Sequence, residues 1–291
     1  MTQSGYAALT TSGFGALWNE GTQADPGTVR ELALESGVAV VKDQAFTEEE
    51  FRAFVSGLGD KVSYDDDDDS VGYGFTDILH LDGTREEGKV ITGRGGLPLH
   101  TDGVLLGTQV DLIVLYAAEA RVQQDGATLV CDQITAWKEL PDHLREVLDR
   151  GHLEYMATER GYFTSVPEGW YRIPTFRDYG RVTSLNLALP FQADEALASW
   201  DVRVPDVSAE ESERFFADLR AHLLSDRYLH EHRWSEGDLV VIDNQRTLHG
   251  RRGLADSASR KLLRGQVTLA KVEGAPGAIS SGSAVQETPA R

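Results

Sequence analysis

The sequence predicts a mainly β fold with flanking helices, of the β-sandwich or jelly-roll kind. Patterns typical of helices lie mostly early and late in the chain, and the material between them suits strands. Residues 152–206 are rich in Tyr, Trp, Gly and Pro without a helical period, which indicates short strands and loops. The regular alternation of strands and helices that marks a doubly wound sheet is not seen. A chain of 291 residues is long enough to form one large domain.

The first helices are expected at residues 26–36 and 47–58. The earlier segment begins with Pro and is followed by Gly, which are typical start and stop residues of a helix. The later segment begins with Thr47 and Glu50, which are spaced as a capping box. A short apolar strand is expected between the two helices, at residues 38–41.

The rest of the chain continues with strands, two further helical segments and a tail. In chain order we expect strands at 110–117 and 127–130, a helix at 134–148 broken near Pro141, a helix at 208–224, and strands at 239–242 and 266–269. Residues 1–271 are expected to form a single domain. Residues 272–291 are rich in Gly, Ser, Ala and Pro and are expected to be a disordered tail.

The charge and cysteine content argue against several classes of function. The chain has 28 basic and 47 acidic residues, a net charge of −19, which disfavours binding to nucleic acid or to an anionic membrane. The single cysteine, Cys131, allows no internal disulfide and no cysteine-rich zinc site. No signal peptide or membrane span is recognised, so a cytoplasmic protein is expected. The run Asp65–Asp69 is expected to be a solvated loop, with a cation or lid loop as the alternative.

One segment, LPLHTDG, carries the pattern of a metal site. In an extended chain His100 and Asp102 point to the same face, so an imidazole and a carboxylate converge there. His249, just after a buried apolar strand, is the candidate for a third ligand. Two histidines and one carboxylate leave three metal positions open, which is the arrangement of non-haem Fe(II) oxygenases.

Two arginines follow the distal histidine at spacings that suit an anion clamp. Arg260 and Arg264 come eleven and fifteen residues after His249, and on a strand both would project into a barrel. Arginine binds carboxylates with bidentate geometry, so the pair suits a dicarboxylate co-substrate. Thr128 is a candidate to add a hydroxyl to this clamp.

Other interpretations of these residues stay open at this point. The segment around His100 is also compatible with a hydrogen-bonded His–Asp pair in a turn, and the two arginines with an ordinary surface pair. His230 and His232 form a second pair at i, i+2, for which a surface turn is expected. The same three ligands would also serve a zinc hydrolase, and a barrel of this kind can be a binding protein without catalysis.

Taken together, these residues resemble the taurine-dioxygenase-like Fe(II)/2-oxoglutarate oxygenases, and within them the carbapenem-synthase type. The stretches that carry the resemblance extend from about residue 12 to 270 and include TSGFGA, KVITGRGGLPLHTDG, TQVDLIVLYAAE, GATLVCD, ELPDHLREVL, ERGYF, GDLVVIDNQRTLH and LLRGQ. The aspartate run and the segment GRRGLADSAS depart from the family pattern, and they put the substrate in doubt more than the oxygen chemistry.

The resemblance implies a distorted jelly roll, the double-stranded β-helix of cupin-like proteins. It implies that His100, Asp102 and His249 bind Fe(II), and that Arg260 and Thr128 hold the far carboxylate of 2-oxoglutarate. Arg264 would face the substrate or the nearer carboxylate, and Arg251 and Trp200 would face the substrate. Tyr64 is the candidate for a catalytic hydrogen donor.

The resemblance also implies an activity. We expect an O₂-consuming dioxygenase of secondary metabolism that oxidises a small carboxylate-bearing cyclic substrate, such as a β-lactam or an amino-acid derivative. The outcome would be epimerisation, desaturation or hydroxylation. The alternative is a hydroxylase of a free amino acid or another small carboxylate. A small molecule is the only expected partner besides another copy of the chain in a homo-oligomer.

Overall fold

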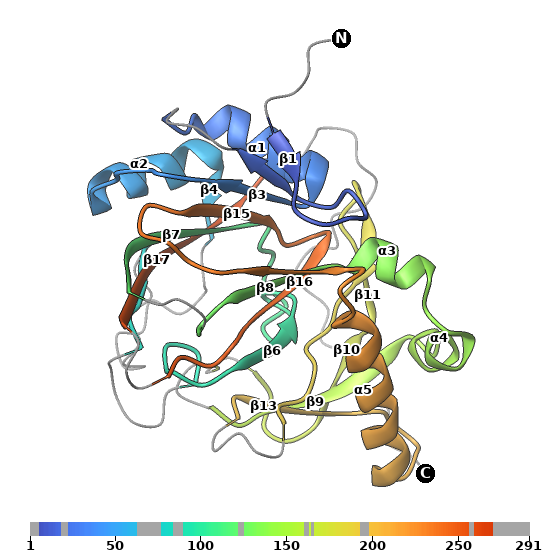
Figure 1. Ribbon diagram of the computed structural model, residues 1–291. Coiled ribbons are helices and arrows are strands. Elements are labelled where there is room, and N and C mark those ends of the chain that lie inside the picture. Colours follow the sequence, from blue (N-terminus) through green and yellow to red (C-terminus); the bar gives the residue numbers. More distant parts are fainter. Residues whose placement is uncertain are drawn as a thin grey trace.

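Two β-sheets face each other at the centre of the molecule, with helices outside them (Figure 1). The computed structural model describes residues 6–18, 23–62, 77–83, 90–121, 125–159, 163, 166–192, 198–255 and 259–269. The larger sheet has the order β1 (Tyr6–Ala8), β2 (Ala16–Trp18), β3 (Val38–Val41), β15 (Leu239–Asp243), β7 (Leu112–Arg121), β17 (Ser259–Thr268) and β4 (Asp60–Lys61), with β5 (Leu79–Leu81) also paired to β17. The smaller sheet has the order β14 (Leu229–His232), β8 (Thr128–Asp132), β16 (Thr247–Arg251) and β6 (Leu97–His100). This architecture confirms the predicted mainly β fold.

The helices cover the outer faces of the two sheets. Helices α1 (Pro26–Ser36) and α2 (Glu48–Leu58) pack on the larger sheet, at the top of Figure 1. Beyond the smaller sheet lie α3 (Gln133–Lys138), α4 (Asp142–Leu148), α5 (Ala209–Leu223) and a three-stranded sheet of β10 (Tyr171–Pro174), β9 (His152–Ala157) and β13 (Trp200–Arg203). A two-stranded sheet of β11 (Phe176–Asp178) and β12 (Thr183–Leu185) lies near α3.

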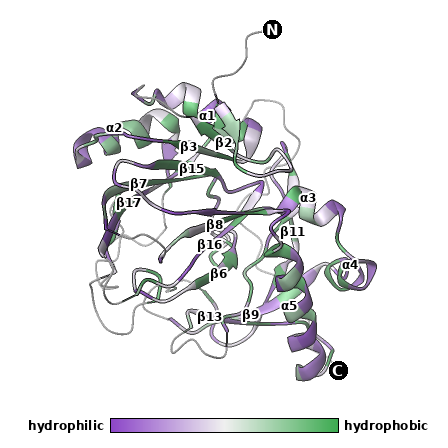
Figure 2. Ribbon diagram, in the orientation of Figure 1, coloured by the Kyte–Doolittle hydropathy of each residue, from purple (hydrophilic) through white to green (hydrophobic). Residues whose placement is uncertain are grey.

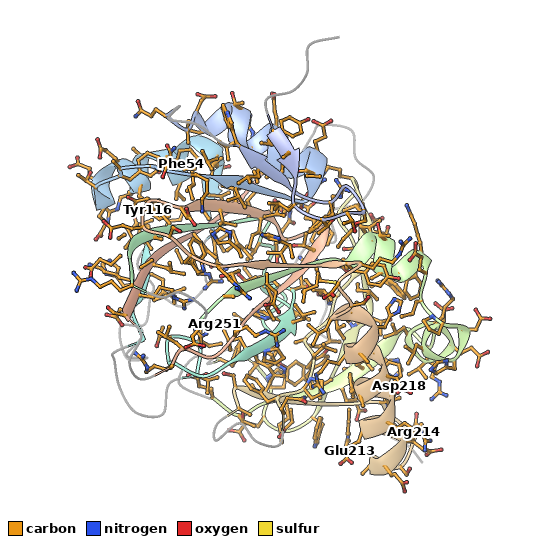
Figure 3. All side chains as sticks on the ribbon, viewed as in Figure 1. Phe54, Tyr116, Glu213, Arg214, Asp218 and Arg251 are labelled. Atoms are coloured by element: carbon orange, nitrogen blue, oxygen red, sulfur yellow. The ribbon has the colours of Figure 1, made fainter. Side chains whose placement is uncertain are left out.

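Alternation along β7 sorts its apolar side chains into two hydrophobic cores. Leu112, Val114 and Tyr116 face α1 and α2, while Ile113 and Leu115 face the space between the sheets. Successive side chains of a strand point to opposite faces, so one fully apolar strand serves both cores. Figure 3 shows Tyr116 on the side of α2, and in Figure 2 the central strands are predominantly hydrophobic.

A third core joins the outer face of the smaller sheet to α5. Leu129, Cys131 and Leu248 point outward from their strands and pack with the apolar face of this helix. The opposite face of α5 is exposed and carries Glu213, Arg214 and Asp218, which Figure 3 labels along this helix. The predicted amphipathic helix is therefore confirmed, and Cys131 is a buried core residue, as expected.

Two of the expected local structures differ from those observed. The last strand is not confined to residues 266–269 but spans Ser259–Thr268, because it alternates pocket-facing and core-facing residues over its whole length. His230 and His232 do not lie in a surface turn. They belong to β14, which pairs with β8, and His232 is only 5% exposed. No helix in the described segments is long and apolar enough to span a membrane.

A glycine allows the two strands of the predicted metal site to lie close together. Gly250 lies on β16 where the register against β6 shifts between His249 and Arg251. A Cβ atom built on Gly250 would lie 2.7 Å from the carbonyl oxygen of Leu97 and 3.2 Å from that of Pro98. These atoms belong to the backbone of β6, so they cannot move aside as a flexible side chain would.

We therefore expect Gly250→Ala to push β6 away from β16. The overpacking should cost about 1–3 kcal/mol of unfolding free energy, measured by urea denaturation. Gly95→Ala is the matched control, because a Cβ atom there meets nothing within 4 Å. Equal stability of the two variants would show that the strand contact tolerates a methyl group.

Candidate metal centre and active site

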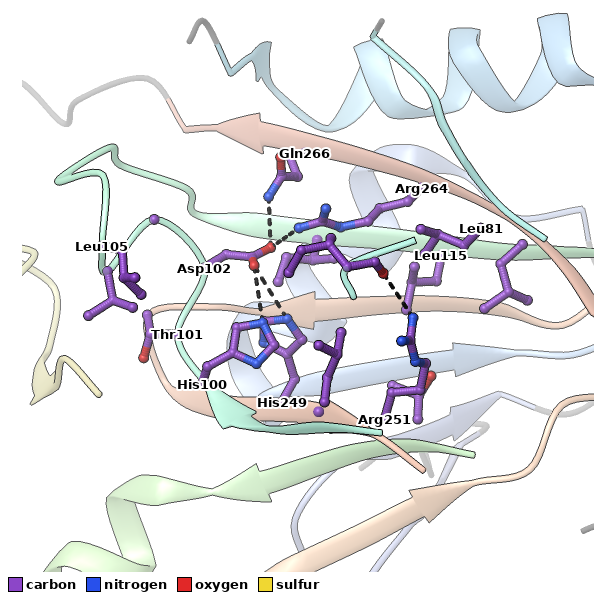
Figure 4. A pocket seen from close by; sticks show the side chains of 18 of the residues that line it. Leu81, His100, Thr101, Asp102, Leu105, Leu115, His249, Arg251, Arg264 and Gln266 are labelled. Carbon is purple, nitrogen blue, oxygen red and sulfur yellow. Dashed lines mark hydrogen bonds and ion pairs between the residues drawn. The ribbon is translucent and has the colours of Figure 1, made fainter. Parts of the chain in front are cut away.

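Strand pairing brings the three predicted metal ligands together. His249 on β16 lies directly opposite His100 at the end of β6, and Asp102 follows two residues later. Oδ1 of Asp102 lies 3.4 Å from Nε2 of His100 and 3.6 Å from Nε2 of His249. One donor atom from each residue falls within 4.8 Å of the others, and the three side chains converge in Figure 4.

The ring of His100 is held with Nε2 toward this cluster. Its Nδ1 lies 2.8 Å from the carbonyl oxygen of Pro98, an arrangement in which Nδ1–H donates and Nε2 keeps its lone pair for a metal. The indole of Trp200 packs against the imidazole, with 5.6 Å between ring centroids. Trp200 is 2% exposed and its Nε1 donates to the carbonyl oxygen of Leu189 at 3.0 Å, so it is a rigid wall for the histidine.

The Asp102 carboxylate is held on one oxygen and faces the cluster with the other. Oδ2 accepts hydrogen bonds from Nη2 of Arg264 and, at 2.7 Å, from Nε2 of Gln266. Asn244 clamps the backbone of Asp102: its Oδ1 accepts from the Asp102 amide at 2.9 Å and its Nδ2 donates to the Asp102 carbonyl at 3.2 Å. With Oδ2 occupied, Oδ1 is the oxygen available to a metal ion.

Electrostatics at the cluster favour the protonation states that bind metal. Burial alone would raise the pKa of Asp102, but Arg264, His249 and His100 outweigh it and hold the pKa well below its usual value. Burial, with the neighbouring His100 and Arg264, lowers the pKa of His249 to about 3. An ionised carboxylate beside a neutral imidazole is the donor set that a divalent transition metal requires.

Arg260 is a buried cation with room for an anionic partner. It is 4% exposed, its Nη1 donates to the carbonyl oxygen of Gly126, and among the described residues its Nε has no hydrogen-bond partner. Burial, together with the nearby Arg94, lowers its pKa to about 10. A buried guanidinium held only by a carbonyl is costly without a counter-charge, so its surroundings fit the far carboxylate of 2-oxoglutarate.

One apolar pocket of about 880 Å³ of empty space, partly open to solvent, connects the cluster to Arg260. Its lining combines the three candidate ligands and the cations with apolar side chains, as Figure 4 shows for most of them. Thr128, Trp200, Arg251, Arg260, Arg264 and Gln266 all contribute to it. The pocket is lined from β6, β7, β8, β16 and β17, so the interior of the two sheets forms the site.

Two arginines have partners that the sequence does not reveal. Arg264 contacts the Asp102 carboxylate, whereas a substrate or co-substrate contact is expected from the sequence. Arg251 donates to the carbonyl oxygens of Val90, Ile91 and Gly95, at 2.7 to 3.0 Å, and thereby holds residues 90–95 over the pocket. The expected substrate contacts of both arginines stay predictions.

A family model matches most of this chain. The model of the taurine catabolism dioxygenase TauD, TfdA family covers residues 13–266. The chain belongs to this family. The predicted enzyme class, a dioxygenase, is thereby confirmed, and the predicted cofactors Fe(II) and 2-oxoglutarate are confirmed at the level of the family.

Relatives of this TauD-family chain include enzymes named for isonitrile chemistry. It is 23% identical over 194 residues to 3-((Z)-2-isocyanoethenyl)-1H-indole synthase of Fischerella ambigua, covering 66% of this chain and 70% of the relative. It is 25% identical over 171 residues to tyrosine isonitrile desaturase of Erwinia amylovora, covering 58% of each chain. The family resemblance is confirmed, and the finer resemblance to the carbapenem-synthase type stays a prediction.

Solved structures share the fold. The PvcB protein of Pseudomonas aeruginosa superposes with a TM-score of 0.67 at 20% identity, covering 92% of this chain and 93% of that one. AAD-2 in complex with Mn(II) and N-oxalylglycine gives a TM-score of 0.64 at 18% identity, covering 91% and 97%. These likenesses confirm the jelly-roll class that the sequence predicts.

Two residues of the site are not predicted from the sequence, and one predicted residue lies outside the described part of the chain. Asn244 and Gln266 are not predicted from the sequence, because amide side chains form no ligand motif. The one signal for Gln266 is that it follows Arg264 by two residues and therefore shares its face of β17. Tyr64 and the run 65–69 lie outside the described residues, so the predicted catalytic role of Tyr64 stays a prediction.

We expect Asn244→Ala to weaken metal binding without removing a ligand. The variant leaves the partly buried amide of Asp102 and the buried Val110 carbonyl oxygen, 2.8 Å from Asn244 Nδ2, without their Asn244 partner. Such losses cost about 1–3 kcal/mol each. Calorimetric titration with Mn(II), as an air-stable substitute for Fe(II), should show lower affinity and urea denaturation lower stability. Unchanged Mn(II) affinity would show that Asp102 is positioned without Asn244.

Proposed function

We propose that the chain is an Fe(II)/2-oxoglutarate-dependent oxygenase that oxidises a small, largely apolar molecule carrying a carboxylate. His100, Asp102 and His249 would hold the metal, and Arg260 with Thr128 would hold the far carboxylate of the co-substrate. The observation that carries this proposal is the buried Arg260 guanidinium in the same pocket as a His–Asp–His cluster.

The cofactors would supply the oxidising power for the reaction. Held by His100, Asp102 and His249, an iron ion would supply O₂ chemistry, with 2-oxoglutarate as the co-substrate that leaves as succinate and CO₂. The chain's own contribution is to bind and orient. Asp102 offers one oxygen because Arg264 and Gln266 engage the other, which would leave open positions for co-substrate and O₂.

The substrate side of the pocket supports an apolar substrate skeleton. The described wall near the cluster includes Val104, Leu105, Leu106, Phe163 and Trp200. Such a wall orients an apolar body by shape and excludes water, which favours controlled hydrogen removal from a bound substrate. An amino-acid derivative or a bicyclic β-lactam carboxylate would suit it. The relatives named for tyrosine isonitrile and indole chemistry favour the amino-acid derivative.

The outcome of the oxidation is part of the proposal. We favour desaturation, because relatives include tyrosine isonitrile desaturases, over hydroxylation or epimerisation. In a zinc hydrolase, the alternative function, Arg260 would have no co-substrate carboxylate to bind. Tyr64 remains the residue we propose as hydrogen donor should the product be an epimer.

The co-substrate site is tested by an anaerobic titration. Fe(II) and 2-oxoglutarate added to the metal-free chain should produce a visible charge-transfer band. Arg260→Ala should raise the 2-oxoglutarate concentration at half-saturation about 10- to 100-fold, since hydrogen bonds to charged groups contribute about 1.5–3 kcal/mol. Arg252→Ala is the matched control, because Arg252 is exposed and pairs with Glu231.

The same titration can overturn the proposal. A chain that forms no band and binds Zn(II) instead would favour the hydrolase. Arg260→Ala with wild-type half-saturation would move the clamp elsewhere in the pocket. Substrates can then be sought among N-substituted aromatic amino acids and β-lactam carboxylates, by their stimulation of succinate formation.

A further inference from the structure

The hydroxyl of Thr128 has a second neighbour that the proposed function does not use. Nε1 of Trp234 donates a hydrogen bond to Oγ1 of Thr128 at 3.0 Å. Both residues are buried, Thr128 at 5% exposure and Trp234 at 3%. Trp234 packs in the core between the two sheets, while Thr128 lines the pocket at the start of β8. A core tryptophan thus contacts a side chain of the candidate co-substrate site.

This bond decides which role the threonine hydroxyl can play in the pocket. A hydroxyl group has one proton to donate and lone pairs to accept with, whereas an indole N–H can only donate. Trp234 therefore occupies one of the two lone pairs of Oγ1, and because the indole cannot accept, the O–H proton must point to another group. In the described part of the chain, Thr128 Oγ1 has no other hydrogen-bond partner.

Arg260 lies on the same side of the pocket as this hydroxyl. Its Nη1 donates to the carbonyl oxygen of Gly126, two residues before Thr128. A Cβ atom on Gly126 would lie 3.1 Å from that same Nη1, so the guanidinium packs closely against this turn. A guanidinium has only donors to offer. With the Thr128 proton also turned to the pocket, both side chains would present a donor to the same anion.

The indole of Trp234 is itself held in place by a chain of buried contacts. The ring of His232 packs edge-on against it, with 4.5 Å between centroids. Nε2 of His232 lies 3.1 Å from Oδ2 of Asp238, and the same oxygen accepts a hydrogen bond from the amide of Ser235 at 2.9 Å. The other oxygen of Asp238, Oδ1, pairs with Nζ of Lys42 at 2.6 Å. His232 lies opposite Thr128 in the β14–β8 register. The indole therefore has little freedom to turn away from Thr128.

We propose that Trp234 is a positioning residue of the co-substrate site, which sets the Thr128 hydroxyl as a donor. This inference rests on the proposed function. Its consequence is selectivity: two directed donors match an ionised carboxylate, which has two accepting oxygens, better than an amide, which has only one.

Anaerobic titration of the Fe(II)-loaded chain with 2-oxoglutarate, followed by the charge-transfer band, tests this role by binding rather than turnover. Trp234→Phe keeps an aromatic ring and removes the N–H. It should raise the dissociation constant for 2-oxoglutarate about 3- to 10-fold, as expected for one hydrogen bond. Trp137→Phe, in a half-buried tryptophan of α3 remote from the pocket, is the matched control and should leave the constant unchanged.

A double-mutant cycle separates positioning from a general loss of packing. If Trp234 acts through the hydroxyl, Trp234→Phe combined with Thr128→Val should bind 2-oxoglutarate no more weakly than Thr128→Val alone. Fold-changes that multiply in the double variant would overturn the inference. So would a Trp234→Phe variant with the wild-type constant.

Discrimination between acid and amide gives a second readout. The 5-amide of 2-oxoglutarate should bind much more weakly than 2-oxoglutarate to the wild-type chain. Trp234→Phe should narrow the ratio of the two dissociation constants, because the variant loses the directed O–H donor that favours the second carboxylate oxygen. An unchanged ratio would contradict the inference. If Trp234→Phe does not fold, His232→Leu, which removes the ring against the indole, should shift the ratio in the same direction.

The proposed function and this inference fail in different ways. No charge-transfer band in the wild-type chain would overturn both. A band that depends on Arg260 but not on Trp234 would overturn the inference alone.

Discussion

The buried carboxylate of Asp102 is the constraint around which the rest of the site is arranged. A carboxylate taken out of water must be compensated by charges and hydrogen bonds. Here the compensation comes from Arg264 and Gln266 on β17, from Asn244 after β15, and from the two histidines. Four separate segments therefore have to meet at one side chain, and the facing sheets are what bring them together.

The two sides of the pocket are built from different kinds of structure. The candidate metal ligands lie on or next to β6 and β16, whose pairing sets His100 opposite His249. The outer wall comes from segments near residues 90–95 and 104–106, which are joined to the sheets by side-chain bonds such as those of Arg251. These loop segments are where the shape of the pocket can vary without disturbing the two sheets.

Much of the fold could be predicted from local patterns. The capping boxes at Thr47 and Ser208 mark the starts of α2 and α5, and both are present in the structure. The i, i+2 rule placed His100 and Asp102 on one face because β6 is extended up to His100. The length of β17 is harder to predict from hydrophobicity, because Arg260, Lys261 and Arg264 interrupt its apolar pattern, although the arginine spacing already indicates a strand.

The roles of individual polar residues were harder to predict, because they depend on partners far away in the chain. Nothing near Arg251 in the sequence signals that its guanidinium meets the carbonyl oxygens of residues 90–95. The histidines of β14 looked like members of a turn because they follow a long helix closely. Pairing with β8, about a hundred residues earlier, makes them part of a sheet.

One strand, β17, carries Arg260, Arg264 and Gln266 at even spacings, so all three face the pocket while Leu263 and Val267 face the helices. Arg260, which we propose to hold the co-substrate, and the two residues that bond to the Asp102 carboxylate thus depend on the same strand register. A single inserted or deleted residue between them would turn one set toward the wrong side of the sheet. Lineages of this chain could therefore vary the pocket walls in length freely, while β17 could change only by substitution.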